Sequence, residues 1–166
     1  MNPRFSVLTT VFDPEPEHLD SCLVSVAAQT YPDAEHIIVD DASTRPDVRG
    51  VLDNLPERPG RKIIRRAVNG GIVAASNDAL DAAAGEFVVL VDHDDVLEPT
   101  ALTTVAERLD ADPAIDVLYS DHDLLRPDGR CATRALGWIG QHPKCGPDDD
   151  RYEHNHQRVV VRTTGG

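Results

Sequence analysis

A run of five apolar residues that leads into a cluster of acids sets the strongest limit on how this chain folds. Phe87 to Val91 are consecutive, and three of the five are β-branched valines. A short continuous run of this kind predicts a strand buried on both faces of a sheet. Asp92, Asp94 and Asp95 follow it directly. The stretch therefore predicts a central strand with an acidic loop at its carboxyl end.

The acidic loop has two interpretations. Carboxylates this close together repel one another, and a bound cation would relieve that repulsion. Hard oxygen ligands suit Mg²⁺ or Mn²⁺ better than zinc. Ligands of sheets with helical crossovers bind beyond the carboxyl ends of the strands. The functional interpretation is a metal-bridged phosphate site, and the alternative is a solvated acidic loop.

The remainder of the chain alternates between strand and helix patterns. Helical spacing of apolar residues begins near Glu17 and again after three of the later strands. This alternation predicts an α/β fold, with a mostly parallel sheet and helices on both faces. The expected strands are 5–11, 36–39, 62–68, 86–91 and 115–119.

Local signals predict where the helices begin and end. Ser43 or Thr44 is expected to cap the second helix. Gly85 is expected to end the third helix as a C-cap, and Pro99 to lie in the first turn of the fourth.

Acidic residues follow several of the expected strands, and parallel strands would bring them to one edge of the sheet. This convergence favours the metal-site interpretation over the solvated loop. The residues concerned are Asp13, Asp40, Asp41, Asp92 to Asp95, Asp121 and Asp123.

Composition narrows the classes of partner. The formal net charge is −13, which disfavours bare nucleic acid and anionic membrane surfaces. No apolar run reaches the length of an integral membrane segment, and Met1 to Arg4 leave no room for a signal peptide. Three cysteines imply no disulfide framework, and Cys22 is expected to be a small buried hydrophobe. We therefore expect a cytoplasmic protein, held at the inner face of the membrane only through partners.

Seven short motifs, in this order and at these spacings, resemble family 2 glycosyltransferases of the GT-A fold. The similarity is strongest to bacterial polysaccharide and rhamnan-type sugar transferases, and it covers about three quarters of the chain. The motifs are Ser6–Pro14, Ser25–Pro32, Ile38–Thr44, Asn69–Ile72, Gly85–Phe87, Val91–Asp95 and Tyr119–Asp121.

The resemblance implies a reaction. A sugar would pass from a nucleotide-sugar donor to a glycan or lipid-linked acceptor, with Mn²⁺ or Mg²⁺ holding the diphosphate. Asp94 matches the metal-ligand aspartate of the D-x-D motif. Asp92 would contact the ribose or share the metal. His93 between them is either a further ligand or a middle residue that points away from the site.

The resemblance also implies a nucleotide pocket. Asp41 matches the aspartate that accepts a ring N–H of the nucleobase, and Asp40 is the less favoured choice. Thr10 and Val11 correspond to the strand end that lines the base pocket. Asn69 and Gly71 match a loop that approaches the nucleotide, where a side chain at Gly71 could crowd it. The basic residues Lys62, Arg65 and Arg66 would either contact a phosphate or decorate an edge strand.

The similarity stops at Arg130. We therefore expect a nucleotide-sugar-binding domain over 1–130 and a divergent, poorly ordered tail over 131–166, in which 159–161 is the only strand-like cluster. A change of reading frame near Arg130 would explain the departure. The family's acceptor segment and catalytic base have no match here, which leaves Asp121 and Asp123 as candidate bases. A non-catalytic nucleotide-sugar-binding module and a non-functional fragment are the alternatives.

Overall fold

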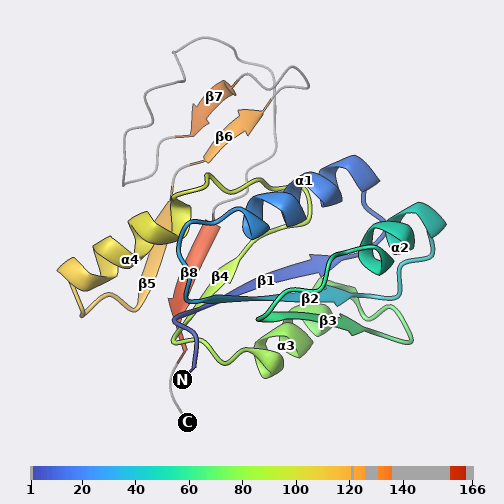
Figure 1. Cartoon of the computed structure of the whole chain (residues 1–166), viewed down its shortest axis with the longest axis horizontal. Coiled ribbons are helices and arrows are strands. Elements are labelled where there is room, and N and C mark those ends of the chain that lie inside the picture. The colour runs from blue at the N-terminus through green and yellow to red at the C-terminus, as the bar shows by residue number, and fades with distance from the viewer. Residues whose placement is uncertain (1, 121, 126–130, 136–157, 164–166) are drawn as a thin grey trace.

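The computed structural model describes residues 2–120, 122–125, 131–135 and 158–163. Within these ranges the chain forms eight strands and four helices (Figure 1). In chain order they are β1 (Phe5–Val11), α1 (Pro16–Ala27), β2 (Ala34–Asp40), α2 (Pro46–Asp53), β3 (Arg61–Arg65), α3 (Gly71–Ala82), β4 (Phe87–Leu90), α4 (Ala101–Ala111), β5 (Val117–Ser120), β6 (His122–Leu125), β7 (Cys131–Ala135) and β8 (Arg158–Arg162).

Six of the strands form one sheet in the order β3-β2-β1-β4-β8-β5. The first four are parallel, and β8 runs antiparallel to both of its neighbours. Strands β6 and β7 form a separate antiparallel pair. The predicted α/β fold with a mostly parallel sheet is therefore confirmed.

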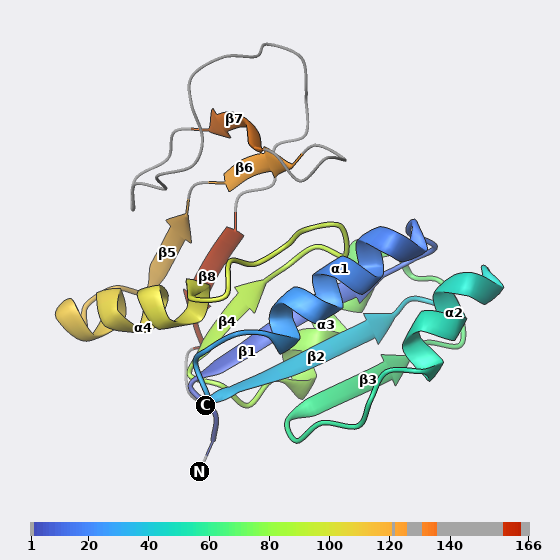
Figure 2. The same ribbon diagram turned by 45° about the horizontal axis from the view of Figure 1, so that its top comes forward.

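Helices cover both faces of the main sheet. Helices α1, α2 and α4 pack on one face, and α3 packs on the other (Figures 1 and 2). Strand β1 is almost entirely buried between these layers, because its successive side chains enter the cores on opposite faces. Cys22, a residue of α1, is fully buried in the core between this helix and the sheet, as predicted. No helix in the described ranges is long and apolar enough to cross a membrane.

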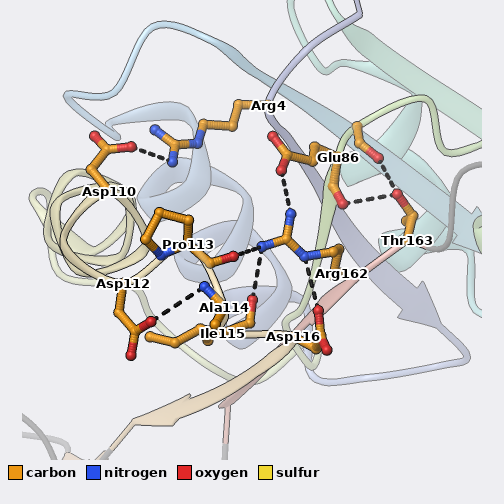
Figure 3. Close-up of polar contacts among 11 residues, drawn as sticks. Arg4, Glu86, Asp110, Asp112, Pro113, Ala114, Ile115, Asp116, Arg162 and Thr163 are labelled. Carbon is orange, nitrogen blue, oxygen red and sulfur yellow. Dashed lines mark hydrogen bonds and ion pairs between the residues drawn. The ribbon is translucent and has the colours of Figure 1, made fainter.

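Strand β8 brings part of the divergent tail into the main sheet, where Arg162 anchors it (Figure 3). Its guanidinium forms ion pairs with Glu86 at 2.7 Å and Asp116 at 3.0 Å, and lies 4.6 Å from the centre of the Phe87 ring. It also donates to two carbonyl oxygens, those of Pro113 and Ile115. The strand-like cluster at 159–161 is thus part of the fold. The sequence predicts a poorly ordered tail over 131–166. Within it, 131–135 and 158–162 form strands, whereas 136–157 and 164–166 lie outside the described residues, so the tail and its division at 130 remain predictions.

Three of the predicted helix boundaries are wrong. Helix α2 has Arg45 at its N-cap, because Ser43 and Thr44 bond to Asp13 instead. Helix α4 begins two residues after Pro99. Helix α3 ends at Ala82, before Gly85.

Gly85 is required for a different reason. A Cβ at this position would lie 2.6 Å from the amide nitrogen of Ser6, closer than real Cβ contacts come. Glycine therefore allows the start of β4 to approach β1 closely, where the Gly85 N–H donates to Ser6 Oγ at 2.8 Å.

Candidate functional site

A pocket of about 220 Å³ lies at the carboxyl end of β1 and β4. Its walls come from the ends of these strands, from the loop after β2 and from the start of α3. The residues that line it are Thr10, Val11, Phe12, Asp41, Ile72, Ala75, Asp92, His93 and Asp94. Five of the residues predicted from the sequence, Thr10, Val11, Asp41, Asp92 and Asp94, therefore share one pocket. Phe12 and Ile72 lie within two of the motifs that carry the resemblance but were assigned no role there, and Ala75 lies outside those motifs.

Asp41 is a buried carboxylate on the pocket wall. One of its oxygens accepts the Gly70 N–H at 2.9 Å, and the other accepts the Gly71 N–H at 2.8 Å. Arg66 Nε forms an ion pair with it at 2.8 Å. Arg66 thus pairs with the Asp41 carboxylate, a role that the sequence did not suggest. A carboxylate can accept about four hydrogen bonds, so Asp41 keeps acceptor capacity beyond its two N–H donors.

Asp40, directly before Asp41, does not line the pocket. Its carboxylate accepts the Ser43 N–H at 2.9 Å and lies 3.8 Å from Arg65. Successive residues at a strand end point to opposite faces of the sheet, which separates these two acids.

Asp13 also turns away from the expected acidic cluster. Its carboxylate accepts the backbone N–H groups of Thr44 and Arg45 at 2.7 and 2.9 Å, and the Thr44 hydroxyl at 2.7 Å. These hydrogen bonds, that from Arg45 first, lower the pKa of Asp13. Asp13 therefore stabilises the turn before α2, and the expected convergence of acids is only partly realised.

Asn69 and Gly71 lie beside the pocket without lining it. Asn69 Nδ2 donates to the carbonyl oxygen of Asp41 at 3.2 Å. Gly71 has φ +79°, which favours glycine, and a Cβ there would meet no atom within 4 Å among the described residues other than its neighbours in the chain and helix. Its requirement for glycine in this structure comes from backbone conformation.

The loop after β4 presents the acids of the predicted D-x-D motif. Asp94 is exposed, and Asp92 and His93 are half-buried. His93 does not point away. It lines the pocket, and its Nδ1 lies 3.2 Å from the carbonyl oxygen of Thr10. Because a carbonyl only accepts, Nδ1 carries the proton of this hydrogen bond.

The pocket fits a metal that arrives with a diphosphate. Within the described ranges, no group of three or more His, Cys, Asp or Glu side chains could hold a metal by itself. Mg²⁺ typically keeps several waters and takes one or two carboxylates together with substrate phosphates. Asp92 and Asp94 on one pocket wall match that donor set. Of the two candidate bases, Asp121 falls outside the described residues, and only the backbone of Asp123, in β6, is described.

Comparison with a family model agrees with this geometry. The model described as "Glycosyl transferase family 2" matches residues 6–121. That range includes every residue that lines the pocket.

Known proteins match the same part of the chain. The O-antigen biosynthesis protein RfbC of Myxococcus xanthus is 37% identical over 128 residues, which are 76% of this chain and 10% of RfbC. The structure of S. aureus TarS in complex with UDP-GlcNAc is 31% identical with a TM-score of 0.62, covering 70% of this chain and 33% of that chain. The mannosyltransferase PcManGT from Pyrobaculum calidifontis, in complex with GDP-Man and Mn²⁺, is 27% identical with a TM-score of 0.61, covering 77% of this chain and 37% of that chain. This chain thus spans a tenth of the length of RfbC and about a third of each solved structure.

Proposed function

Because this chain belongs to glycosyl transferase family 2, we propose that it binds a nucleotide-sugar donor with a divalent metal for transfer of the sugar to a glycan or lipid-linked acceptor. One observation carries the proposal. Asp41 and the pair Asp92 and Asp94 lie some fifty positions apart in the sequence, yet they line one pocket at the carboxyl edge of the sheet. A cytoplasmic site of action is part of the same proposal.

The two sides of the pocket suit the two halves of a nucleotide diphosphate. On one side, Asp41 keeps acceptor capacity beside the apolar side chains of Val11 and Ile72. This combination favours a base with a ring N–H, namely uracil, thymine or guanine. On the other side, Asp92 and Asp94 repel a bare diphosphate and would hold a cation that attracts it.

In this proposal the chain's own groups bind and orient the donor. The Gly70 and Gly71 N–H groups keep the Asp41 carboxylate in place, and the hydrogen bond from His93 to Thr10 joins the two halves of the pocket. A divalent ion held by Asp92 and Asp94 would offset charge on the leaving diphosphate. Both TarS and PcManGT were solved with nucleotide sugars, and PcManGT also with Mn²⁺, which supports this assignment.

Calorimetry tests the proposal. Titration with UDP, dTDP and GDP should give heat in Mn²⁺, which EDTA abolishes, and CDP and ADP should bind less well. Asp94→Asn should weaken the Mn²⁺-dependent binding at least about tenfold, because metal affinity depends on the charge of the ligand. The matched control is Asp81→Asn, at an exposed position near the end of α3, which should bind like the wild type.

Two results would contradict the proposal. Binding that is equally tight in EDTA would remove the metal from the donor site. Equal effects of Asp94→Asn and Asp81→Asn would show that the D-x-D carboxylate has no special role.

A further inference from the structure

The loop that carries Asp92 and Asp94 is bound along one side by helix α1. We infer that Ser25, in the last turn of α1, and Gln29, two residues after the end of α1, are positioning residues that hold this carboxylate pair at the pocket. The inference rests on the proposed function, since it concerns the same metal and diphosphate. The sequence motif that contains both residues contributed to the family resemblance without any assigned role.

Ser25 binds the far end of the loop. Its side chain is buried, and its Oγ accepts the Leu97 N–H at 3.0 Å while donating to the carbonyl oxygen of Cys22 at 2.8 Å. One turn earlier on the same helix face, Cys22 Sγ donates to the carbonyl oxygen of Asp92 at 3.3 Å. Helix α1 therefore contacts the loop at Asp92, where it begins, and again at Leu97.

Gln29 binds the segment that follows. Its Nε2 donates to the carbonyl oxygen of Glu98 at 2.8 Å and to that of Ser25 at 3.2 Å. Its Oε1 accepts the Leu102 N–H at 3.1 Å. Helix α4 has no side-chain hydrogen bond from its own N-cap residue, Thr100, so Gln29, just after α1, supplies an acceptor for the first turn of α4. One amide side chain thus joins α1, the end of the loop and the start of α4.

The loop needs such support because it has no regular structure of its own. Residues 91–98 lie between β4 and α4, and within them the turn from Asp92 to Asp95 closes with a hydrogen bond of 3.0 Å. His93 of the same loop bonds to Thr10 of β1, so the loop that carries the two acids is held by β1 as well as by α1 and Gln29. Groups that orient metal ligands in this way typically affect metal affinity or activity 10–100-fold.

Matched serine variants test the inference. Ser25→Ala leaves the buried Leu97 N–H without its acceptor. Ser21→Ala makes the same change on the exposed face of α1, where the hydroxyl bonds only within the helix to Glu17. Gln29→Leu removes the second anchor. Each variant is titrated with UDP and with GDP in Mn²⁺, and with uridine and guanosine without metal.

We expect Ser25→Ala and Gln29→Leu to lower the Mn²⁺-dependent affinity about tenfold and the nucleoside affinity less than twofold, whereas Ser21→Ala changes neither. A general structural defect would lower both affinities together, and that result would overturn the positioning role. Affinities equal to those of the wild type would overturn it as well.

Hydrogen exchange provides a readout that needs no ligand. The amides of Asp95 and Leu97 should exchange at least tenfold faster in Ser25→Ala than in Ser21→Ala. Absence of nucleotide binding by the wild type would contradict the proposed function alone. Unchanged hydrogen exchange in Ser25→Ala would instead overturn the role of α1 in holding the loop.

Discussion

At the scale of single residues, His36 is a buried imidazole that makes stability depend on pH. Burial, followed by the charges of Arg61 and Arg58, lowers its pKa to about 3. Its Nε2 lies 3.1 Å from Thr9 Oγ1, and its Nδ1 has no hydrogen-bond partner among the described residues. The ring therefore remains neutral in the folded protein at pH values where an unfolded chain would protonate it.

The consequence is a loss of stability in acid. An unfolded histidine titrates near pH 6.5, so between pH 6.5 and about 3 the unfolded chain binds a proton that the folded chain does not. Stability should fall as the pH drops through this window, by up to about 1.4 kcal/mol per pH unit from this group. The free energy of unfolding can be measured in urea at pH 7, 6 and 5 and plotted against pH. The slope of this plot should be shallower for His36→Leu than for the wild type. His18→Leu, at an exposed position on α1, should retain the wild-type slope, and equal slopes for all three proteins would refute the assignment.

At the scale of elements, β8 completes the sheet, because β5 pairs with no other strand in the described residues. Arg162→Met would remove the ion pairs to Glu86 and Asp116, the two hydrogen bonds to carbonyl oxygens and the contact with Phe87. Exposed ion pairs contribute little, so most of the expected loss of about 2 kcal/mol comes from the carbonyl hydrogen bonds and the ring contact.

Urea unfolding measures this loss directly. Arg108→Met, at an exposed position in the last turn of α4, removes the same charge and should cost less than about 0.5 kcal/mol. A similar small cost for Arg162→Met would mean that residues 158–163 contribute little to the folded unit.

At the scale of the whole molecule, we predict that this chain binds its donor but transfers the sugar slowly. General-base assistance contributes about 10²–10⁴-fold, and positioning of the acceptor adds to it. By the family resemblance, both would come from the segment that should follow Arg130, for which we expect no match in this sequence. Asp41, a carboxylate of the pocket, is already bound by two N–H groups and an arginine.

A turnover assay with several nucleotide sugars and with rhamnose- or hexose-ended acceptors tests this prediction. We expect slow hydrolysis of the donor, with the Asp94→Asn variant as the background. Turnover on the order of 1 s⁻¹, ordinary for an enzyme, that Asp94→Asn abolishes would show that the chain supplies its own base and acceptor site.

The sequence by itself determined the fold class, the parallel strands and the edge at which the acids gather. These features follow from local patterns: β-branched runs form buried strands, helical spacing forms their covering helices, and parallel strands place their carboxyl ends together. That edge, with Asp41, Asp92 and Asp94 at one pocket, was therefore predictable.

Only the tertiary structure decided which polar side chains line the pocket and which stabilise the fold elsewhere. Asp13, Asp40 and Asp41 all accept backbone N–H groups, but of the three Asp41 lines the pocket, because the donors that each acid meets come from different elements. Strand β8 lies between β4 and β5 in the sheet. The sequence predicts a strand-like cluster at 159–161 but not this place in the sheet, since its partners β4 and β5 lie far away in sequence. For the same reason the hydrogen bonds from α1 to the loop after β4 could not be predicted. Contacts between distant segments leave no local pattern in the chain that forms them.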